Sequence, residues 1–158
     1  MSASLENTIS SHPFFHDMKP NHLATLSHGA SEAQYKPGEI LFNEKEPANR
    51  FFLLQQGRIA LEAHEPNDGT VVVQLLEPGD VFGWSWLFPP FAWHLRARAV
   101  EQCTVIVLDG GHLLGTAESD RDFGYELMKR IAQVVIQRLQ STRRQLFQIQ
   151  SEQLCEVK

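Results

Sequence analysis

Residues 36–61 read KPGEILFNEKEPANRFFLLQQGRIAL, and this stretch decides the fold class. Its apolar residues form short runs rich in Ile, Leu and Phe. Turn-forming clusters separate these runs, with KPG before the first and QQG before the last. Short apolar runs bounded by Gly, Pro and polar residues are typical of strands joined by tight turns. The stretch therefore predicts a β-rich domain.

The same pattern continues as far as the DGG cluster that begins at Asp109. Further β-rich runs read TVVVQLLE (70–77), DVFG (80–83) and RARAVEQCTVIVLD (96–109), and the clusters EPNDG and EPGD lie between runs. GRIALEAH (57–64) and TVVVQLLE flank EPNDG, so these two runs predict a β-hairpin. No helical pattern lies between the strands, which favours a jelly roll over a parallel sheet.

Helical patterns lie on both sides of this β-region. We expect short helices over 12–30, one short helix over 110–118, and a long helix that follows it. An apolar seam with spacings of three and four runs along the long helix: Met128, Ile131, Val135, Leu139, Thr142, Leu146 and Ile149. The expected segments are a flexible N-terminus (1–11), the β-roll with its N-terminal helices (12–120), the long helix (121–150) and a tail (151–158).

The long helix is longer than one small β-domain can cover. A helix that folds back on its own sheet accounts for residues 124–139, but it leaves Leu146, Phe147 and Ile149 without a partner. The same helix of a second copy would cover these side chains. The sequence therefore predicts a homodimer through Leu139, Leu146 and Ile149 of the long helix.

The composition argues against several classes of protein. The 158 residues carry a formal net charge of -5, so no whole-protein attraction to nucleic acid or to an anionic membrane is expected. No apolar stretch approaches the roughly 20 residues of a membrane span. Residues 1–12 have neither the basic nor the apolar region of a signal peptide. We expect one cytoplasmic domain without a membrane anchor.

Several motifs, taken in order, resemble one family. Besides residues 36–61, these are EPGDVFG (77–83), RARAVEQCTVIVLD (96–109) and RLQST (138–142). Together with the order helices, β-strands, long helix, they resemble the cyclic-nucleotide-binding domain, in particular the sensor domains of Crp/Fnr regulators. The resemblance implies an eight-stranded β-roll (a jelly roll, or double-stranded β-helix) followed by a long C-terminal helix. It also implies a regulatory role in signal transduction, in which a ligand in the phosphate-binding cassette repositions the following helix.

The departures from the family lie in the cassette, here residues 79–99. The family has a glutamate for the ribose 2′-hydroxyl directly after the glycine of the FG step, and that position is Trp84. A gapless count to Ala99 puts the family's phosphate-binding arginine at Trp93. Loss of one member of a buried charge pair costs about 2–5 kcal/mol, so cAMP binding in the usual charged manner is not expected. Strand alternation turns Arg96 and Arg98 to the face opposite Ala99; the alternative is that one of them reaches the phosphate.

The resemblance and the cassette together give a set of candidate ligand-binding residues. They are Phe82, Gly83, Trp84, Ser85, Trp93, His94, Arg138 and Thr142. Two interpretations stay open. Trp84 and Trp93 clamp a cyclic nucleotide or another small planar ligand, or the pocket is filled with protein by five aromatic residues: Trp84, Trp86, Phe88, Phe91 and Trp93. Arg138 and Thr142 lie four residues apart on the helix face that meets the base in the family, and a plain exposed helix face is their alternative.

Other site classes have little support in the sequence. His12, His16, His22 and His28 cluster near the N-terminus, but Pro13 and Pro20 break any ligand spacing, so we expect surface histidines and no metal or other cofactor. Nothing resembles a nucleophile–base pair, so an enzyme is not expected.

Direct DNA binding is not expected either. A helix-turn-helix needs two further helices, and only nine residues follow Ile149. The expected partner is an effector protein that the sequence does not identify. A ligand-free protein-interaction module on the same fold is the alternative function.

Overall fold

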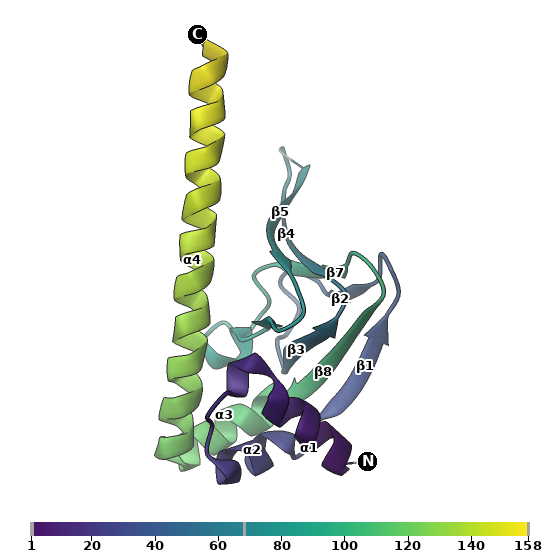
Figure 1. Ribbon diagram of the computed structural model, residues 1–158. Coiled ribbons are helices and arrows are strands. Elements are labelled where there is room, and N and C mark those ends of the chain that lie inside the picture. Colours follow the sequence, from purple (N-terminus) through teal and green to yellow (C-terminus); the bar gives the residue numbers. More distant parts are fainter. Residues whose placement is uncertain (1, 68, 158) are drawn as a thin grey trace.

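The computed structural model describes residues 2–67 and 69–157. Its helical elements are α1 (Ser2–Ser11), η1 (Pro13–Phe15), α2 (Pro20–Ser27), η2 (Ser85–Leu87), α3 (Gly110–Ser119) and α4 (Arg121–Val157). Its strands are β1 (Ser31–Tyr35), β2 (Ile40–Phe42), β3 (Arg50–Gln56), β4 (Ile59–Glu65), β5 (Gly69–Leu76), β6 (Val81–Phe82), β7 (Arg96–Ala99) and β8 (Cys103–Asp109). Figure 1 shows the strands beside one long helix that runs the length of the molecule.

The described strands form two four-stranded antiparallel sheets. Their orders are β1-β8-β3-β6 and β2-β7-β4-β5. The predicted hairpin is confirmed, since β4 pairs with β5 from Ile59 opposite Leu76 to Glu65 opposite Gly69. The expected architecture, an eight-stranded β-roll followed by a long helix, is confirmed as well.

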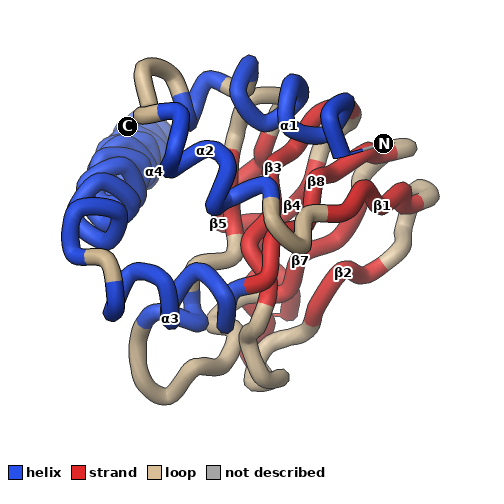
Figure 2. Tube along the Cα trace, turned by 90° about the horizontal axis from the view of Figure 1, so that it is seen from below, coloured by secondary structure: helices blue, strands red, loops and turns tan. Residues whose placement is uncertain are grey.

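The core lies between the two sheets and extends under the helices. Residues 51–54 of β3 are all buried, on both faces of the strand. One face of β3 meets the opposite sheet. The helices lie together on one side of the strands (Figure 2). Phe15, Leu26 and Phe123 from three of these helical elements are buried with the sheet residues, so roll and helices share one core.

Helix α4 has two faces with different surroundings. Phe123, Leu127 and Ile131 are buried against the rest of the domain. Ile131 of the seam predicted from the sequence packs on the domain, whereas the other residues of that seam, such as Met128 and Leu139, are exposed. Beyond about residue 141 the helix extends past the body of the domain, and its apolar side chains, such as Leu146, are exposed (Figure 1).

Both ends of the chain differ from the expected segments. Residues 2–11, expected to be flexible, form α1, and the side chain of Ile9 is fully buried on the core. The expected tail from residue 151 continues α4 as far as Val157. Residues 150–157 contain neither Gly nor Pro, so nothing in that stretch stops the helix.

Candidate ligand site

The cassette loop connects β6 to β7 and carries η2. Gly83 directly after β6 has φ +87°, in the left-handed region that favours glycine. A Cβ atom at this position would lie 3.0 Å from the backbone oxygen of Arg50 and 3.2 Å from Cη2 of Trp93. The loop thus turns tightly against β3, and the glycine lets it approach both the strand and the indole.

Trp93 lies inside the β-roll. Its side chain is 4% exposed, and its ring stacks on that of Phe42 with centroids 3.8 Å apart and an interplanar angle of 15°. Backbone hydrogen bonds hold both sides of the residue: its N–H donates to the carbonyl of Glu46 over 3.0 Å, and its carbonyl accepts from the N–H of Lys45 over 2.8 Å. An indole fixed in this way belongs to the core.

Trp84 and Arg138 connect the cassette with α4. The guanidinium carbon of Arg138 lies 4.7 Å from the centroid of the Trp84 ring, in cation–π geometry. The same guanidinium donates a hydrogen bond to the backbone oxygen of Val81. Burial lowers the pKa of Arg138 to about 10, and nearby Asp80 only partly opposes this shift. The side chain stays charged at neutral pH, and no ion pair with a carboxylate is found for it among the described residues.

Little empty volume remains next to the two tryptophans. A cavity of about 120 Å³ is lined by Phe42, Leu61, Gly83, Trp84, Ser85, Trp93, His94, Leu95 and Arg138. Pockets for cofactors and drug-sized ligands usually measure about 300–1,000 Å³. The cavity is therefore too small for a nucleotide in this conformation.

Six of the eight candidate ligand residues line this cavity: Gly83, Trp84, Ser85, Trp93, His94 and Arg138. Phe82 does not line it, because its ring is fully buried and stacks on Phe52 with centroids 4.8 Å apart. Thr142 is exposed on α4, outside the cavity. Whether the six residues bind a ligand stays a prediction.

The two arginines of β7 face away from the cavity, as strand alternation predicts. Arg96 and Arg98 each donate to Glu62 of β4 through two nitrogens, over 2.8–3.0 Å and 2.8–3.1 Å respectively. The Glu62 side chain is 5% exposed. The hydrogen bond from Arg98, assisted by that from Arg96, lowers the pKa of Glu62. Ala97 and Ala99 of the same strand are fully buried on the inner face.

The residue that anchors the loop is Trp86, which the sequence placed among the aromatic residues that fill the pocket and not among the candidate ligand residues. Trp86 of η2 is 3% exposed, and its Nε1 donates to the carbonyl oxygen of Gly83 over 2.6 Å. Its ring lies edge-on to Phe51, with centroids 6.1 Å apart. A Cβ on Gly110 would lie 2.7 Å from the indole, so glycine at the start of α3 makes room for it. Phe88 and Phe91, which the sequence placed in the same group, are exposed and do not fill the pocket.

A larger hollow, of about 500 Å³, lies outside the cassette along α4. It is lined by Pro13, Phe14, His16, Gln74, Gly79, Asp80, Val81, Arg130, Gln133, Val134, Gln137, Arg138 and Ser141. Arg130 and Arg138 both donate to backbone carbonyls there. The two arginines that line this hollow are therefore accounted for by contacts within the chain, and they do not by themselves indicate a ligand.

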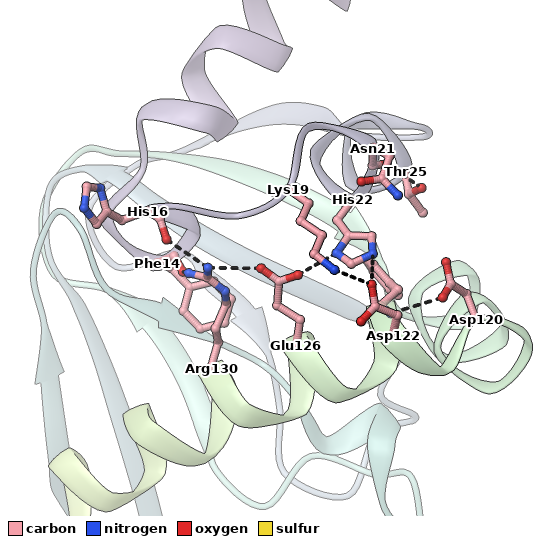
Figure 3. A network of polar contacts seen from close by, with 11 residues as sticks. Phe14, His16, Lys19, Asn21, His22, Thr25, Asp120, Asp122, Glu126 and Arg130 are labelled. Atoms are coloured by element: carbon pink, nitrogen blue, oxygen red, sulfur yellow. Dashed lines mark hydrogen bonds and ion pairs between the residues drawn. The ribbon is translucent and has the colours of Figure 1, made fainter.

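The N-terminal histidines correct a further expectation. His16 and His28 are exposed, but His12 and His22 are buried, so the assignment of all four to the surface was wrong. The Nδ1 atom of His12 accepts from the N–H of Phe14, and His22 contacts Glu126 of α4 (Figure 3). In residues 2–67 and 69–157, no group of three or more His, Cys, Asp or Glu side chains is placed to hold a metal ion.

None of the described helices combines the length and the apolar character that crossing a bilayer requires.

Comparisons with known proteins agree with this architecture. A family model described as "Cyclic nucleotide-binding domain" matches residues 32–120, more than half of the chain. A CRP-like cAMP-activated global transcriptional regulator of Mycobacterium tuberculosis is 22% identical over 132 residues, which is 84% of this chain and 57% of the relative. The acetyltransferase Pat of Mycolicibacterium smegmatis is 31% identical over 70 residues, 44% of this chain and 21% of that enzyme. The chain thus spans less than two thirds of the length of these relatives.

A solved structure shows the same fold over most of this chain. The putative cyclic nucleotide-binding protein of Geobacter metallireducens is 26% identical, with a TM-score of 0.76 over 85% of this chain and 97% of that one. The family match also covers the part of the chain that holds both sheets and the cassette. On these grounds, the chain belongs to the cyclic nucleotide-binding domain family.

Proposed function

We propose that this chain is a regulatory domain in which Trp93 occupies the space that a nucleotide takes in other members of the family. The observation that carries the proposal is the burial of Trp93, which is 4% exposed and stacked on Phe42. Only about 120 Å³ stays empty beside it. A cyclic nucleotide would have to displace an indole from the core before it could enter.

The charges around the cavity support the same conclusion. A buried phosphate needs a counter-charge, and an indole supplies none. Arg96 and Arg98 are both held by Glu62 on the other face of the sheet. Arg138 is the cation at the cavity, but it stacks on Trp84 and donates to the backbone of β6. We therefore propose that cAMP is not bound in the family's charged manner.

Calorimetry with cAMP tests this proposal. We expect any binding of cAMP to the unmodified chain to have a dissociation constant above about 1 μM. A constant of about 1 μM corresponds to a binding free energy of about 8 kcal/mol, which would have to arise without a counter-charge for the phosphate. The variant Trp84→Glu/Trp93→Arg, which restores the two charges of the family, is expected to bind cAMP more tightly than the parent. Circular dichroism checks that it is folded. Micromolar or tighter binding by the parent chain would show the proposal to be wrong.

Helix α4 is the element that we propose transmits the regulatory signal. Its exposed face carries positions whose spacings alternate strictly between three and four: Tyr125, Met128, Ala132, Val135, Leu139, Thr142, Leu146 and Ile149. Such a pattern favours pairing of two helices in a coiled coil. We propose that two copies of the chain pair through this seam, and that a protein partner responds to the position of α4. A cytoplasmic location stays a prediction.

A further inference from the structure

A buried imidazole lies where α2 meets the start of α4. The side chain of His22 is 1% exposed, and its ring is edge-on to Phe123 with centroids 5.4 Å apart. Figure 3 shows the ring between Glu126 and Asp122, two carboxylates of α4. This histidine neither lines the cassette cavity nor belongs to the exposed seam of α4.

Each ring nitrogen of His22 faces a carboxylate. Nδ1 lies 2.5 Å from Oε2 of Glu126, and Nε2 lies 3.5 Å from Oδ2 of Asp122. Nε2 is buried and makes no hydrogen bond in the described part of the chain. A neutral imidazole has one N–H and one lone pair, so one nitrogen must turn its lone pair toward carboxylate oxygen. A protonated ring turns an N–H toward each carboxylate instead.

The surrounding charges keep both carboxylates in place. Lys19 Nζ lies 2.7 Å from Oδ2 of Asp122 and lowers the pKa of that carboxyl, so Asp122 stays ionised near neutral pH. An Nη of Arg130 lies 3.2 Å from Oε1 of Glu126. Asp120, at the turn before α4, accepts from the N–H of Phe123. These are the charged groups that α2, α4 and the preceding turn present to the ring (Figure 3).

The same network reaches the N-terminal segment. The Arg130 guanidinium donates to the carbonyl oxygens of Phe14 and His16, over 2.6 and 2.8 Å. Glu126 therefore contacts His22 on one side and, on the other, the arginine that holds residues 13–16. A stronger bond to the imidazole would fasten both η1 and α2 to α4.

We propose that His22 is a proton-responsive clasp between the N-terminal helices and α4. Uptake of a proton at Nε2 turns the contact with Asp122 into a charge-assisted hydrogen bond and strengthens the one to Glu126. Because both ring nitrogens face carboxylate oxygens, we expect docking to strengthen as the pH falls from about 8 to 5.5, the range in which histidine side chains change charge. Asp122 stays ionised over that range, because Lys19 lowers the pKa of its carboxyl.

Denaturant unfolding of the full chain at pH 8 and pH 5.5 tests the clasp. The variant His22→Gln keeps a polar side chain but cannot titrate. For each protein, the measured quantity is the factor by which the ratio of folded to unfolded protein changes between pH 8 and pH 5.5. We expect this factor to be roughly tenfold larger for the parent than for the variant. His28→Gln, at an exposed histidine outside the network, is the matched control and should behave like the parent.

Two more variants separate the clasp from a purely structural role. Asp122→Asn removes the anion opposite Nε2 and should reduce the pH dependence, whereas Lys19→Gln keeps that anion and should preserve it. NMR titration of the His22 ring in the parent chain gives a readout even if His22→Gln does not fold. A ring that stays neutral at pH 5.5, or a His22→Gln variant with the parent's pH dependence, would overturn the proposal.

Discussion

Trp84 and Trp93 share a residue type but differ in their physical roles. Trp93 is part of the core, where an aromatic ring contributes through its buried area and its stacking on Phe42. Trp84 is half-buried at the edge of the roll, where its ring face meets the cation of Arg138. Under the proposed function, the tryptophans at the two positions that are charged in the family make these internal contacts in place of contacts to a ligand.

Replacing Trp93 by alanine tests its place in the core. The substitution leaves a large cavity between Phe42 and the cassette, so we expect the free energy of unfolding to fall by about 3–5 kcal/mol. Trp84→Ala is the control, and it should cost clearly less because that ring is only half-buried. Denaturant melts measure both variants. Equal and small losses would mean that neither indole fills the roll.

Glu62 provides a prediction about pH. Its pKa in the folded protein is lowered from the ordinary value of 4.5 by hydrogen bonds from Arg98 and Arg96. A lowered pKa means that the ionised carboxylate stabilises the fold above about pH 4.5 and that this contribution is lost as the pH falls below it. We expect Glu62→Gln to cost about 1–3 kcal/mol at pH 7, and the difference from the parent to shrink in acid.

The control for this substitution is Glu65→Gln, at an exposed position of the same strand. It should leave the unfolding free energy nearly unchanged at both pH values. A Glu62→Gln variant as stable as the parent at pH 7 would show that the two arginines do not depend on this carboxylate.

At the scale of elements, local sequence patterns predict some of the strands and miss others. The β4–β5 hairpin and the two faces of β7 follow from turn residues and from alternation, because both are properties of neighbouring residues. Strand β1 (SEAQY) has no apolar alternation, and the residue pattern did not indicate it. Its pairing with β8 supplies the backbone hydrogen bonds that define it, and that pairing joins residues about 70 positions apart.

The candidate site was predictable only in part for the same reason. Six residues of the cassette and α4 were placed together by resemblance, and the structure brings them to one cavity. Whether Trp93 lines that cavity or fills it depends on the position of Phe42, on a strand that precedes it by about 50 residues. The burial of His22 likewise depends on α4, which lies about 100 residues further along the chain. Such contacts leave no local periodicity.

Helix α4 gives a prediction at this scale. Leu146 is 58% exposed on the seam and lies beyond the part of the helix that packs on the roll. A charge at this position should be unfavourable only if a second helix covers it. We expect the parent chain to be a dimer by light scattering and Leu146→Asp to be a monomer of unchanged fold.

The matched control is Gln148→Asp, which places the same charge on the same stretch of α4 away from the seam. It should remain a dimer. A monomeric parent chain, or a dimer that tolerates Leu146→Asp, would contradict the pairing through this seam.

At the scale of the whole molecule, the roll and the long helix meet at a small number of side chains. The lower part of α4 is fixed by its buried residues, Phe123, Leu127 and Ile131, and by the ion pairs of Glu126. Farther along, Arg138 joins the helix to the cassette through Trp84 and through the carbonyl of Val81. Beyond Ser141, which is half-buried, the described side chains of α4 are exposed, and the helix continues past the body of the domain (Figure 1). Arg138 is therefore the last strong link between the roll and the projecting half of α4.

Replacing Arg138 by alanine should loosen this link without unfolding the roll, because Trp93 and its stacking on Phe42 stay in place. We expect hydrogen exchange of the α4 amides over residues 134–145 to rise several-fold, while exchange in β3 and β8 stays unchanged. Arg144→Ala, at an exposed arginine of the same helix, is the control and should not alter exchange. Measuring both variants in the Leu146→Asp background prevents pairing of two helices from masking the effect. Unchanged exchange in Arg138→Ala would show that the burial of Ile131 and the residues before it is sufficient to hold α4 against the roll.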